Sequence, residues 1–300
     1  MKMQVQMLGD DFAAMITAKP GQALGDVAGP QALASVQQHG ALLLRGFAGD
    51  LATFERFTQT VAARFIHNGN DSRESLGDEG KTRSVTPGSN FVGPHSEFSY
   101  MPFRPDVLFF YCTRPASDGG ASLLWDGIRL WDQMPESSKA LFMNRSIRYQ
   151  YRQVELPFFA QFFGTNDADT ILAALQSVPG AVCTRHGEHI DFEYNVPAQV
   201  YRSIDGAQAF SNSIAVFPQT GFDDASLLDP AIRADLLDIA LRNTVSIDLQ
   251  AGDVLIVDNW RAMHGRGAFD DPQRQICIRM GYFANDVVQP FSAALEEIEY

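Results

Sequence analysis

The spacing of hydrophobic and polar residues predicts helices and one strand at the start of the chain. "GPQALASVQQHG" (29–40) has a helical period and ends at a glycine, and "ALLLRGF" (41–47) is typical of a buried strand. "DLATFERFTQTVAARF" (50–65) is amphipathic, with Leu51, Phe54, Phe57 and Val61 at three-to-four spacing after Asp50 as a cap. These elements predict a preamble of helices and a strand over about residues 1–65.

Farther along the chain, short apolar runs separated by turn residues predict strands. They are "HSEFSY" (95–100), "DVLFFYCT" (106–113), "ASLLWDG" (121–127), two strands in "TVSIDLQAGDVLIVDN" (244–259), and "RQICIRMGYF" (274–283). Helices are predicted for "PESSKALFMN" (135–144), "DADTILAALQSV" (167–178) and "PAIRADLLDIALRN" (230–243). The order does not alternate as βαβ units would, so a mainly β sandwich or barrel with helical decoration is predicted.

Two segments lack a clear period. Residues 68–90 are polar and rich in Gly and Ser, which indicates a mobile loop, whereas residues 149–209 are dense in aromatic residues. The chain has 300 residues, 45% of them hydrophobic, which is enough for a sizeable core. We expect one domain over 1–300.

Charge and composition exclude several classes of function. A formal net charge of −13 argues against nucleic acid as a partner, because such binding depends on clustered Lys and Arg. No segment approaches about 20 apolar residues, so no membrane span is expected. The three cysteines, Cys112, Cys183 and Cys277, show neither a disulfide framework nor paired zinc spacing. We expect a soluble protein of a reducing, cytoplasmic compartment.

Three residues form a candidate metal site. On a strand, positions i and i+2 share a face, so His95 and Glu97 can converge on one point. His264 follows the strand "GDVLIVDN" and can supply a third ligand. Two histidines and one carboxylate form the facial triad of non-haem Fe(II) oxygenases. Other interpretations remain open: a solvent-facing Glu97 with ordinary histidines, a zinc hydrolase, or a non-catalytic jelly-roll binding protein of the cupin type.

Two arginines in the last strand extend this site. Arg274 begins an otherwise apolar stretch, and a buried arginine is costly unless it is paired. Its planar guanidinium matches a carboxylate in bidentate fashion. Arg279 has the opposite strand parity, so both side chains cannot face one pocket on a regular strand.

Together these stretches resemble the taurine dioxygenase (TauD/TfdA)/clavaminate synthase-like family of Fe(II)/2-oxoglutarate oxygenases. The resemblance is carried by "HSEFSY", "FYCTRPASDGGASLLWD", "GDVLIVDNWRAMHGRGAF" and "RQICIRM", and covers most of the chain from about residue 40. It implies a double-stranded β-helix, or jelly roll, flanked by helices. It also implies that His95, Glu97 and His264 are the iron ligands, with 2-oxoglutarate and O2 as cosubstrates.

The resemblance further assigns residues to the cosubstrate. Ser122 matches a position usually held by Thr, whose hydroxyl helps to bind the far carboxylate of 2-oxoglutarate, and Arg274 matches the arginine that pairs with it. A second family arginine usually lies four residues later, where this chain has Ile278 and places Arg279 one position further. Whether Arg274 or Arg279 holds the cosubstrate therefore stays open, as does a substrate role for Arg279.

The resemblance also implies a class of substrate. Many members of the family carry Asp at the position of Glu97. A Glu at this position resembles the clavaminate synthase-like branch, which acts largely on amino acids and natural-product intermediates. The resemblance implies hydroxylation or desaturation of an unactivated carbon, with release of succinate and CO2. A small substrate is expected, an amino acid or derivative, free or bound to a carrier protein. Candidate substrate contacts are Arg279, Asn212 and Phe98, with 149–210 as a variable covering insert and 68–90 as a lid.

Overall fold

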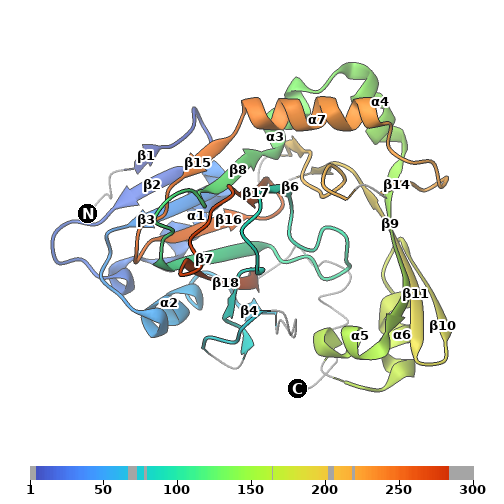
Figure 1. The fold of residues 1–300 in the computed structure, drawn as a ribbon, viewed down its shortest axis with the longest axis horizontal. Coiled ribbons are helices and arrows are strands. Elements are labelled where there is room, and N and C mark those ends of the chain that lie inside the picture. Colours follow the sequence, from blue (N-terminus) through green and yellow to red (C-terminus); the bar gives the residue numbers. More distant parts are fainter. Residues whose placement is uncertain are drawn as a thin grey trace.

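The fold is built from two facing sheets with helices on the outside (Figure 1). In the computed structural model, residues 5–66, 73–77, 80–163, 165–201, 206–217 and 220–283 are described. Among these residues, no helix is long and apolar enough to cross a membrane.

The larger sheet has eight strands. Seven follow the order β1-β2-β3-β16-β7-β18-β4, and β5 pairs with β18 off this path. The strands are β1 (Val5–Met7), β2 (Ala14–Thr17), β3 (Ala41–Arg45), β4 (Arg64–Phe65), β5 (Arg83–Ser84), β7 (Val107–Arg114), β16 (Val254–Asp258) and β18 (Gln275–Tyr282). Only β2 and β3 pair in parallel; the other described pairs of this sheet are antiparallel.

The smaller sheet has the antiparallel order β15-β8-β17-β6. Its strands are β6 (Val92–His95), β8 (Ser122–Asp126), β15 (Val245–Ile247) and β17 (Ala262–Arg266). Strands distant in sequence are neighbours in both sheets, and the two sheets enclose a common core. The mainly β, jelly-roll fold expected from the sequence is confirmed.

The central strand β7 shows why the sandwich is stable. All residues from Val107 to Cys112 are buried, because both faces of the strand are covered. Leu108 and Phe110 point into the core between the sheets. Val107 and Phe109 point outward, where they pack in a second core with α1 (Gly29–His39) and α2 (Leu51–Thr58). A continuous apolar run is thus the signature of a strand between two apolar layers.

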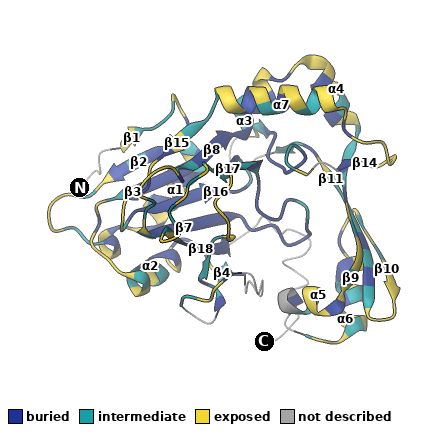
Figure 2. Cartoon of the chain, in the orientation of Figure 1, coloured by how far each residue is buried: buried dark blue, intermediate teal, exposed yellow. Residues whose placement is uncertain are grey.

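Helices cover the outer face of the smaller sheet as well. They are α3 (Gly127–Gln133), α4 (Glu136–Asn144) and α7 (Pro230–Arg242). Trp125 and Met263 of the sheet pack against Leu130, Phe142 and Leu236 of these helices. Figure 2 shows the resulting pattern, with buried central strands and an exposed outer face on α7.

A third sheet lies beside the sandwich, at the right of Figure 1. It has the order β10-β11-β9-β14 and carries two helices; Phe159, Ile171 and Phe192 are in its apolar core. Its elements are β9 (Ser146–Glu155), α5 (Leu156–Phe163), α6 (Ala168–Gln176), β10 (Ala181–His186), β11 (His189–Pro197) and β14 (Gly221–Phe222). A separate two-stranded sheet joins β12 (Val200–Tyr201) and β13 (Gln208–Ala209). This side sheet corresponds to the aromatic segment that showed no clear period.

Two local expectations differ from the structure, and a third, over 68–90, falls partly outside the described residues. The predicted helix over 50–65 ends at Thr58, and residues 64–65 form β4 instead. "HSEFSY" is not a strand, because β6 ends at His95 and a turn follows. Within 68–90, residues 68–72 and 78–79 lie outside the described residues. The described remainder is attached to the sandwich: β5 pairs with β18, and the Val85 amide donates to the Ile276 carbonyl at 3.1 Å.

Candidate active site

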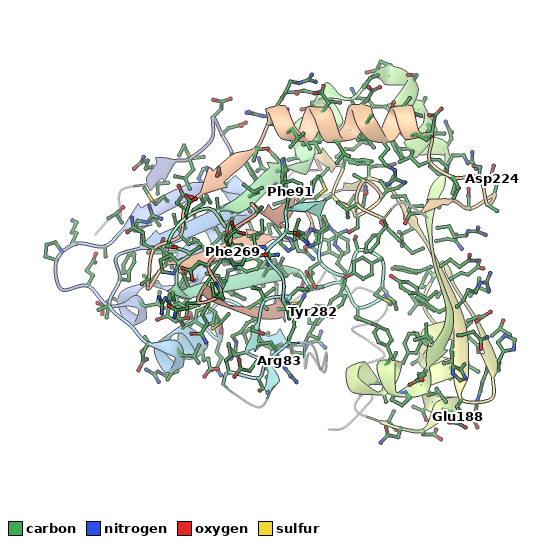
Figure 3. The ribbon with its side chains drawn as sticks, viewed as in Figure 1. Arg83, Phe91, Glu188, Asp224, Phe269 and Tyr282 are labelled. Atoms are coloured by element: carbon green, nitrogen blue, oxygen red, sulfur yellow. The ribbon has the colours of Figure 1, made fainter. Side chains whose placement is uncertain are left out.

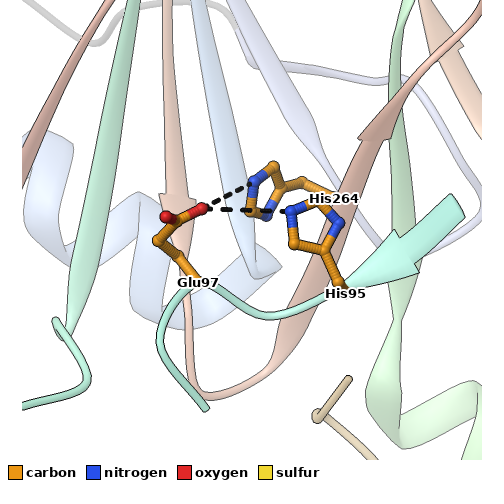
Figure 4. Close-up of side chains that lie close together, drawn as sticks. All are labelled: His95, Glu97 and His264. Carbon is orange, nitrogen blue, oxygen red and sulfur yellow. Dashed lines mark ion pairs between the residues drawn. The ribbon is translucent and has the colours of Figure 1, made fainter. Parts of the chain in front are cut away.

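Pairing between β6 and β17 brings the two candidate histidines together. His95 and His264 are direct partners in the antiparallel register, and their ring centroids are 4.2 Å apart. Glu97 returns to them from the turn after β6, so that its Oε2 lies 3.6 Å from His264 Nε2 and 3.9 Å from His95 Nε2 (Figure 4). The prediction that strand parity aligns His95 with Glu97 was therefore wrong, because the strand ends at His95.

The backbone of Glu97 is fixed by a side chain that the sequence analysis did not single out. Asn259, between β16 and β17, accepts a hydrogen bond from the Glu97 amide at 2.9 Å and donates one to the Glu97 carbonyl at 2.9 Å. Its amide nitrogen also donates to the Pro105 carbonyl at 2.9 Å. Phe98 then adopts a left-handed φ of 51°, which turns the chain away. Asn259 lies in the "DNWR" stretch, but no spacing rule identified its role.

The donor atoms suit a divalent transition metal. Each of the three residues offers a ligand atom, and these atoms all lie within 4.8 Å of one another. The His95 Nδ1 lies 2.9 Å from the Gly93 carbonyl, which favours a proton there and leaves Nε2 free as a base. Burial, reinforced by the nearby charges of His95 and Arg73, holds the pKa of His264 well below its usual range. Two imidazoles and a buried carboxylate form the set that binds Fe(II) in a facial triad.

The triad opens into a cavity that also contains the expected cosubstrate residues. Ser122 and Arg274 line it, together with apolar side chains such as Phe110, Ile276 and Ile278. Arg274 Nη2 donates to the Gly120 carbonyl at 3.2 Å, and the guanidinium lies 5.0 Å from the ring centroid of Phe269. Burial, with a contribution from Arg266, lowers the pKa of Arg274 to about 10, so it stays charged at neutral pH.

The sequence matches the profile of a known protein family over most of its length. The profile described as "Taurine catabolism dioxygenase TauD, TfdA family" matches residues 8–280. The chain belongs to this family. It is a TauD/TfdA dioxygenase, and the expected reaction class, Fe(II)- and 2-oxoglutarate-dependent oxygenation, is confirmed at the level of the family.

Relatives of the TauD/TfdA chain are distant in sequence. A clavaminate synthase-like protein from Arabidopsis thaliana is 24% identical over 270 residues, which cover 80% of this chain and 81% of the relative. The PvcB protein from Pseudomonas aeruginosa gives a TM-score of 0.61 at 17% identity, covering 94% and 92% of the two chains. A second structure, of PvcB as an Fe, alpha-ketoglutarate dependent oxygenase from an isonitrile synthetic pathway, gives 0.62 at 18% identity and the same coverage. The structural likeness supports the shared jelly-roll fold.

None of the three expected substrate contacts is among the residues that line this cavity of the TauD/TfdA chain. Arg279 is fully buried on the opposite face of β18 from Ile276 and Ile278, where Nη1 donates to Thr82 at 2.8 Å and lies 3.4 Å from Glu55. Strand alternation is the physical reason, and of these two arginines it leaves Arg274 on the cavity side.

Asn212 and Phe98 have local structural roles. The Asn212 side chain donates to the Ala198 carbonyl at 2.7 Å and accepts from the Ile214 amide at 3.0 Å. Phe98 is buried and packs edge-on against Phe103, with centroids 5.3 Å apart. Both residues shape loops near Glu97.

Two further charged residues line the cavity and were missed. Arg73 and Arg266 both lie there, Arg73 from the polar stretch expected to be a lid and Arg266 from β17. Arg266 is two residues after His264, which could have been read from strand alternation. Arg73 lies in no recognisable motif, and only the fold brings it to the triad.

Proposed function

We propose that His95, Glu97 and His264 hold Fe(II), and that Arg274 and Ser122 hold the distal carboxylate of 2-oxoglutarate. The protein then oxidises an unactivated carbon of a small substrate, by hydroxylation or desaturation, and releases succinate and CO2. The single observation that supports this most strongly is the convergence of three donor atoms on one cavity that also contains Ser122 and Arg274.

The chain's own residues have separable tasks in this proposal. When bound, iron with 2-oxoglutarate supplies the activation of O2 and the oxidative decarboxylation of the keto acid. His95 and His264 would contribute imidazole nitrogen lone pairs, and Glu97 would contribute a negative charge. Arg274 supplies a charge-assisted pair and Ser122 a hydroxyl donor. The aliphatic lining, including Leu124 and Leu255, excludes water from the region where oxidation takes place.

The substrate class is proposed as an amino acid or a derivative of one, free or carrier-bound, in natural-product biosynthesis. Two observations support this class of substrate. The carboxylate of the proposed metal site is a Glu, Glu97, and the chain is similar to a clavaminate synthase-like protein and to PvcB of an isonitrile synthetic pathway. The side sheet over 146–197 is the proposed cover of the substrate side, and the stretch 68–90 the proposed lid, within one oxygenase domain.

Anaerobic spectroscopy tests the assignment. Addition of Fe(II) and 2-oxoglutarate to the metal-free protein should produce a weak visible charge-transfer band that neither component gives alone. Succinate release with a panel of amino acids and their derivatives then identifies the substrate. A zinc hydrolase or a binding protein would give neither signal, and absence of the band at saturating iron and 2-oxoglutarate would refute the proposal.

A further inference from the structure

Arg73 is a buried cation whose hydrogen-bonding capacity is only partly used. It is 8% exposed and lines the same cavity as the triad. Its Nη2 donates to Glu97 Oε1 at 3.3 Å and to Thr86 Oγ1 at 2.8 Å. Its Nε and Nη1 are buried and have no hydrogen-bond partner among the residues that the structure describes. Buried donors without partners are costly, so their retention at a site points to a ligand.

The surrounding structure holds Arg73 in this position. The Arg83 side chain donates to the Arg73 carbonyl at 3.0 Å, and the Ser84 amide donates to the Glu74 carbonyl at 2.9 Å. Arg83 and Ser84 form β5, which is paired with β18, so the arginine is tied to the sandwich. Arg83 is labelled at this strand in Figure 3. These contacts fix the backbone at Arg73, and the hydrogen bonds to Glu97 and Thr86 orient its guanidinium.

The charges that line the cavity leave a positive excess. Arg73, Arg266 and Arg274 face a single carboxylate, Glu97. A divalent metal ion and the 2-oxoglutarate dianion would cancel each other, so their binding does not remove the excess. Arg266 uses its terminal nitrogens on the carbonyls of Thr86 and Asn90, at 3.3 and 3.1 Å. Of these three arginines, Arg73 is the one that contacts a candidate metal ligand, Glu97. It also has two nitrogens without a hydrogen-bond partner among the described residues.

We propose that Arg73 binds an anionic group of the substrate, so that the enzyme acts on small carboxylic acids held by that carboxylate. The inference rests on the proposed function, because it assigns Arg274 to 2-oxoglutarate and leaves Arg73 for the substrate. Arg279, which was expected to take this role, faces the opposite side of β18. A guanidinium offers two parallel N–H groups to a carboxylate, and an uncharged isostere cannot replace that pair at equal strength.

Nuclear magnetic resonance of the arginine side chains tests this directly with acetate as the probe. Protein labelled with ¹⁵N-arginine is saturated with Zn(II) and 2-oxoglutarate, so that the cosubstrate position is filled. Acetate is then titrated at constant ionic strength, with acetamide as the uncharged control. The Arg73 Nε–H signal is assigned by its loss in Arg73→Lys. We expect a saturable shift of this signal with acetate, at a half-saturation at least about tenfold below that for acetamide.

Several outcomes would overturn the proposal. They are an unmoved Arg73 signal, an equal response to acetate and acetamide, and a response confined to Arg274. A role in cosubstrate binding is checked with Arg73→Gln, whose 2-oxoglutarate half-saturation in the charge-transfer titration should stay within about threefold of wild type. A rise of more than about tenfold there would make Arg73 a cosubstrate residue and also overturn the proposal.

The two proposals fail separately. Absence of the Fe(II)–2-oxoglutarate band in the wild-type protein counts against the proposed function, whatever acetate does. A normal band without an acetate response at Arg73 counts against this inference alone. If Arg73→Gln does not fold, Arg73→Lys serves for the cosubstrate titration, because it keeps the positive charge beside Glu97 and removes the bidentate geometry.

Discussion

Glu97 is a buried carboxylate whose charge is compensated by its neighbours. It is 4% exposed, so an isolated carboxylate there would be strongly unfavourable. Arg73 lies 3.3 Å from one oxygen, and the imidazoles of His264 and His95 face the other. Asn259 holds the peptide on both sides. The surroundings therefore fix the carboxylate where a cation between the imidazoles would meet it.

Glu97→Ala is expected to abolish substrate-coupled succinate release and to weaken Fe(II) binding by more than about 100-fold. Mutation of a residue that only hydrogen-bonds to a metal ligand typically lowers metal affinity by about 10- to 100-fold. Glu97 is proposed as a ligand itself, so the loss should be larger. Anaerobic iron titration measures the affinity. Glu188→Ala is the matched control, because Glu188 is exposed at the tip of the β10–β11 hairpin (Figure 3). Full activity in Glu97→Ala would remove this residue from the site.

Arg274→Gln is expected to raise the half-saturating concentration of 2-oxoglutarate by about 30- to 140-fold. The loss of a charge-assisted pair accounts for about 2–3 kcal/mol, and 1.4 kcal/mol corresponds to about tenfold. Arg279→Gln is the control on the same strand. It should lower the melting temperature, since Arg279 contacts Glu55 and Thr82, yet leave the 2-oxoglutarate requirement within about twofold. The reverse pattern would contradict the strand register.

At the scale of elements, the site depends on the close pairing of β6 with β17. Gly265 lies where the pairing of β17 with β6 shifts register, between His264 and Arg266. A Cβ at Gly265 would lie 2.3 Å from the Val92 carbonyl oxygen and 2.8 Å from the Trp125 ring. The backbone of β6 and a fully buried ring leave no room for a side chain there.

Gly265→Ala is therefore expected to separate β6 from β17 and to weaken metal binding by more than about tenfold, with a loss of stability of about 1–3 kcal/mol. Thermal melting and anaerobic iron titration give the two values. Gly25→Ala is the control, because a Cβ there meets nothing within 4 Å. Unchanged iron affinity in Gly265→Ala would show that this pairing does not position the histidines.

The hydrophobic pattern predicted most core elements because their burial is periodic or complete. β7, β8, β16 and β18 carry apolar runs between two layers, and α6 and α7 have a helical period. The pattern was uninformative over the side sheet. There β9 alternates between partly exposed and buried positions only at its start, and farther along Arg152 pairs with Asp191 and Glu193.

The candidate site was predictable only as far as motifs and strand parity extend. His95, Glu97 and His264 were found by residue type and order, and parity separated Arg274 from Arg279. The turn that places Glu97 was not predicted, because it depends on Asn259, which is distant in sequence. Arg73 reaches the cavity through β5 and β18, so its position is a property of the sheet and not of its own segment.

At the scale of the whole molecule, the apolar clusters around the sheets bury groups that titrate at high pH. Burial raises the pKa of Cys112 and Cys277 to about 12, from an ordinary value of 9.0, and that of Tyr149 to about 12. The folded protein therefore keeps protons that the unfolded chain loses first. Stability contributed by these groups is complete below about pH 9 and is lost as pH rises toward 12.

The free energy of unfolding is expected to decrease steadily from pH 9 upward. The slope is negative because the native state binds more protons than the unfolded state. Urea titrations between pH 7 and pH 10.5 measure it. The double variant Cys112→Ala/Cys277→Ala should show a shallower decline, since two of the responsible groups are gone. A wild-type stability that is level across this range would contradict the burial of these thiols.

The position of β6 at the edge of the smaller sheet affects the local stability of the metal-free protein when iron is scarce. This four-residue strand is hydrogen-bonded to β17 on one side, and the turn with Glu97 follows it directly. An ion shared by His95, Glu97 and His264 would cross-link that edge to the sheet, and binding to the native state alone adds to stability by mass action. Iron starvation should therefore expose residues 92–97 first to amide hydrogen exchange and to proteases. Degradation of the metal-free enzyme would then begin at the site itself.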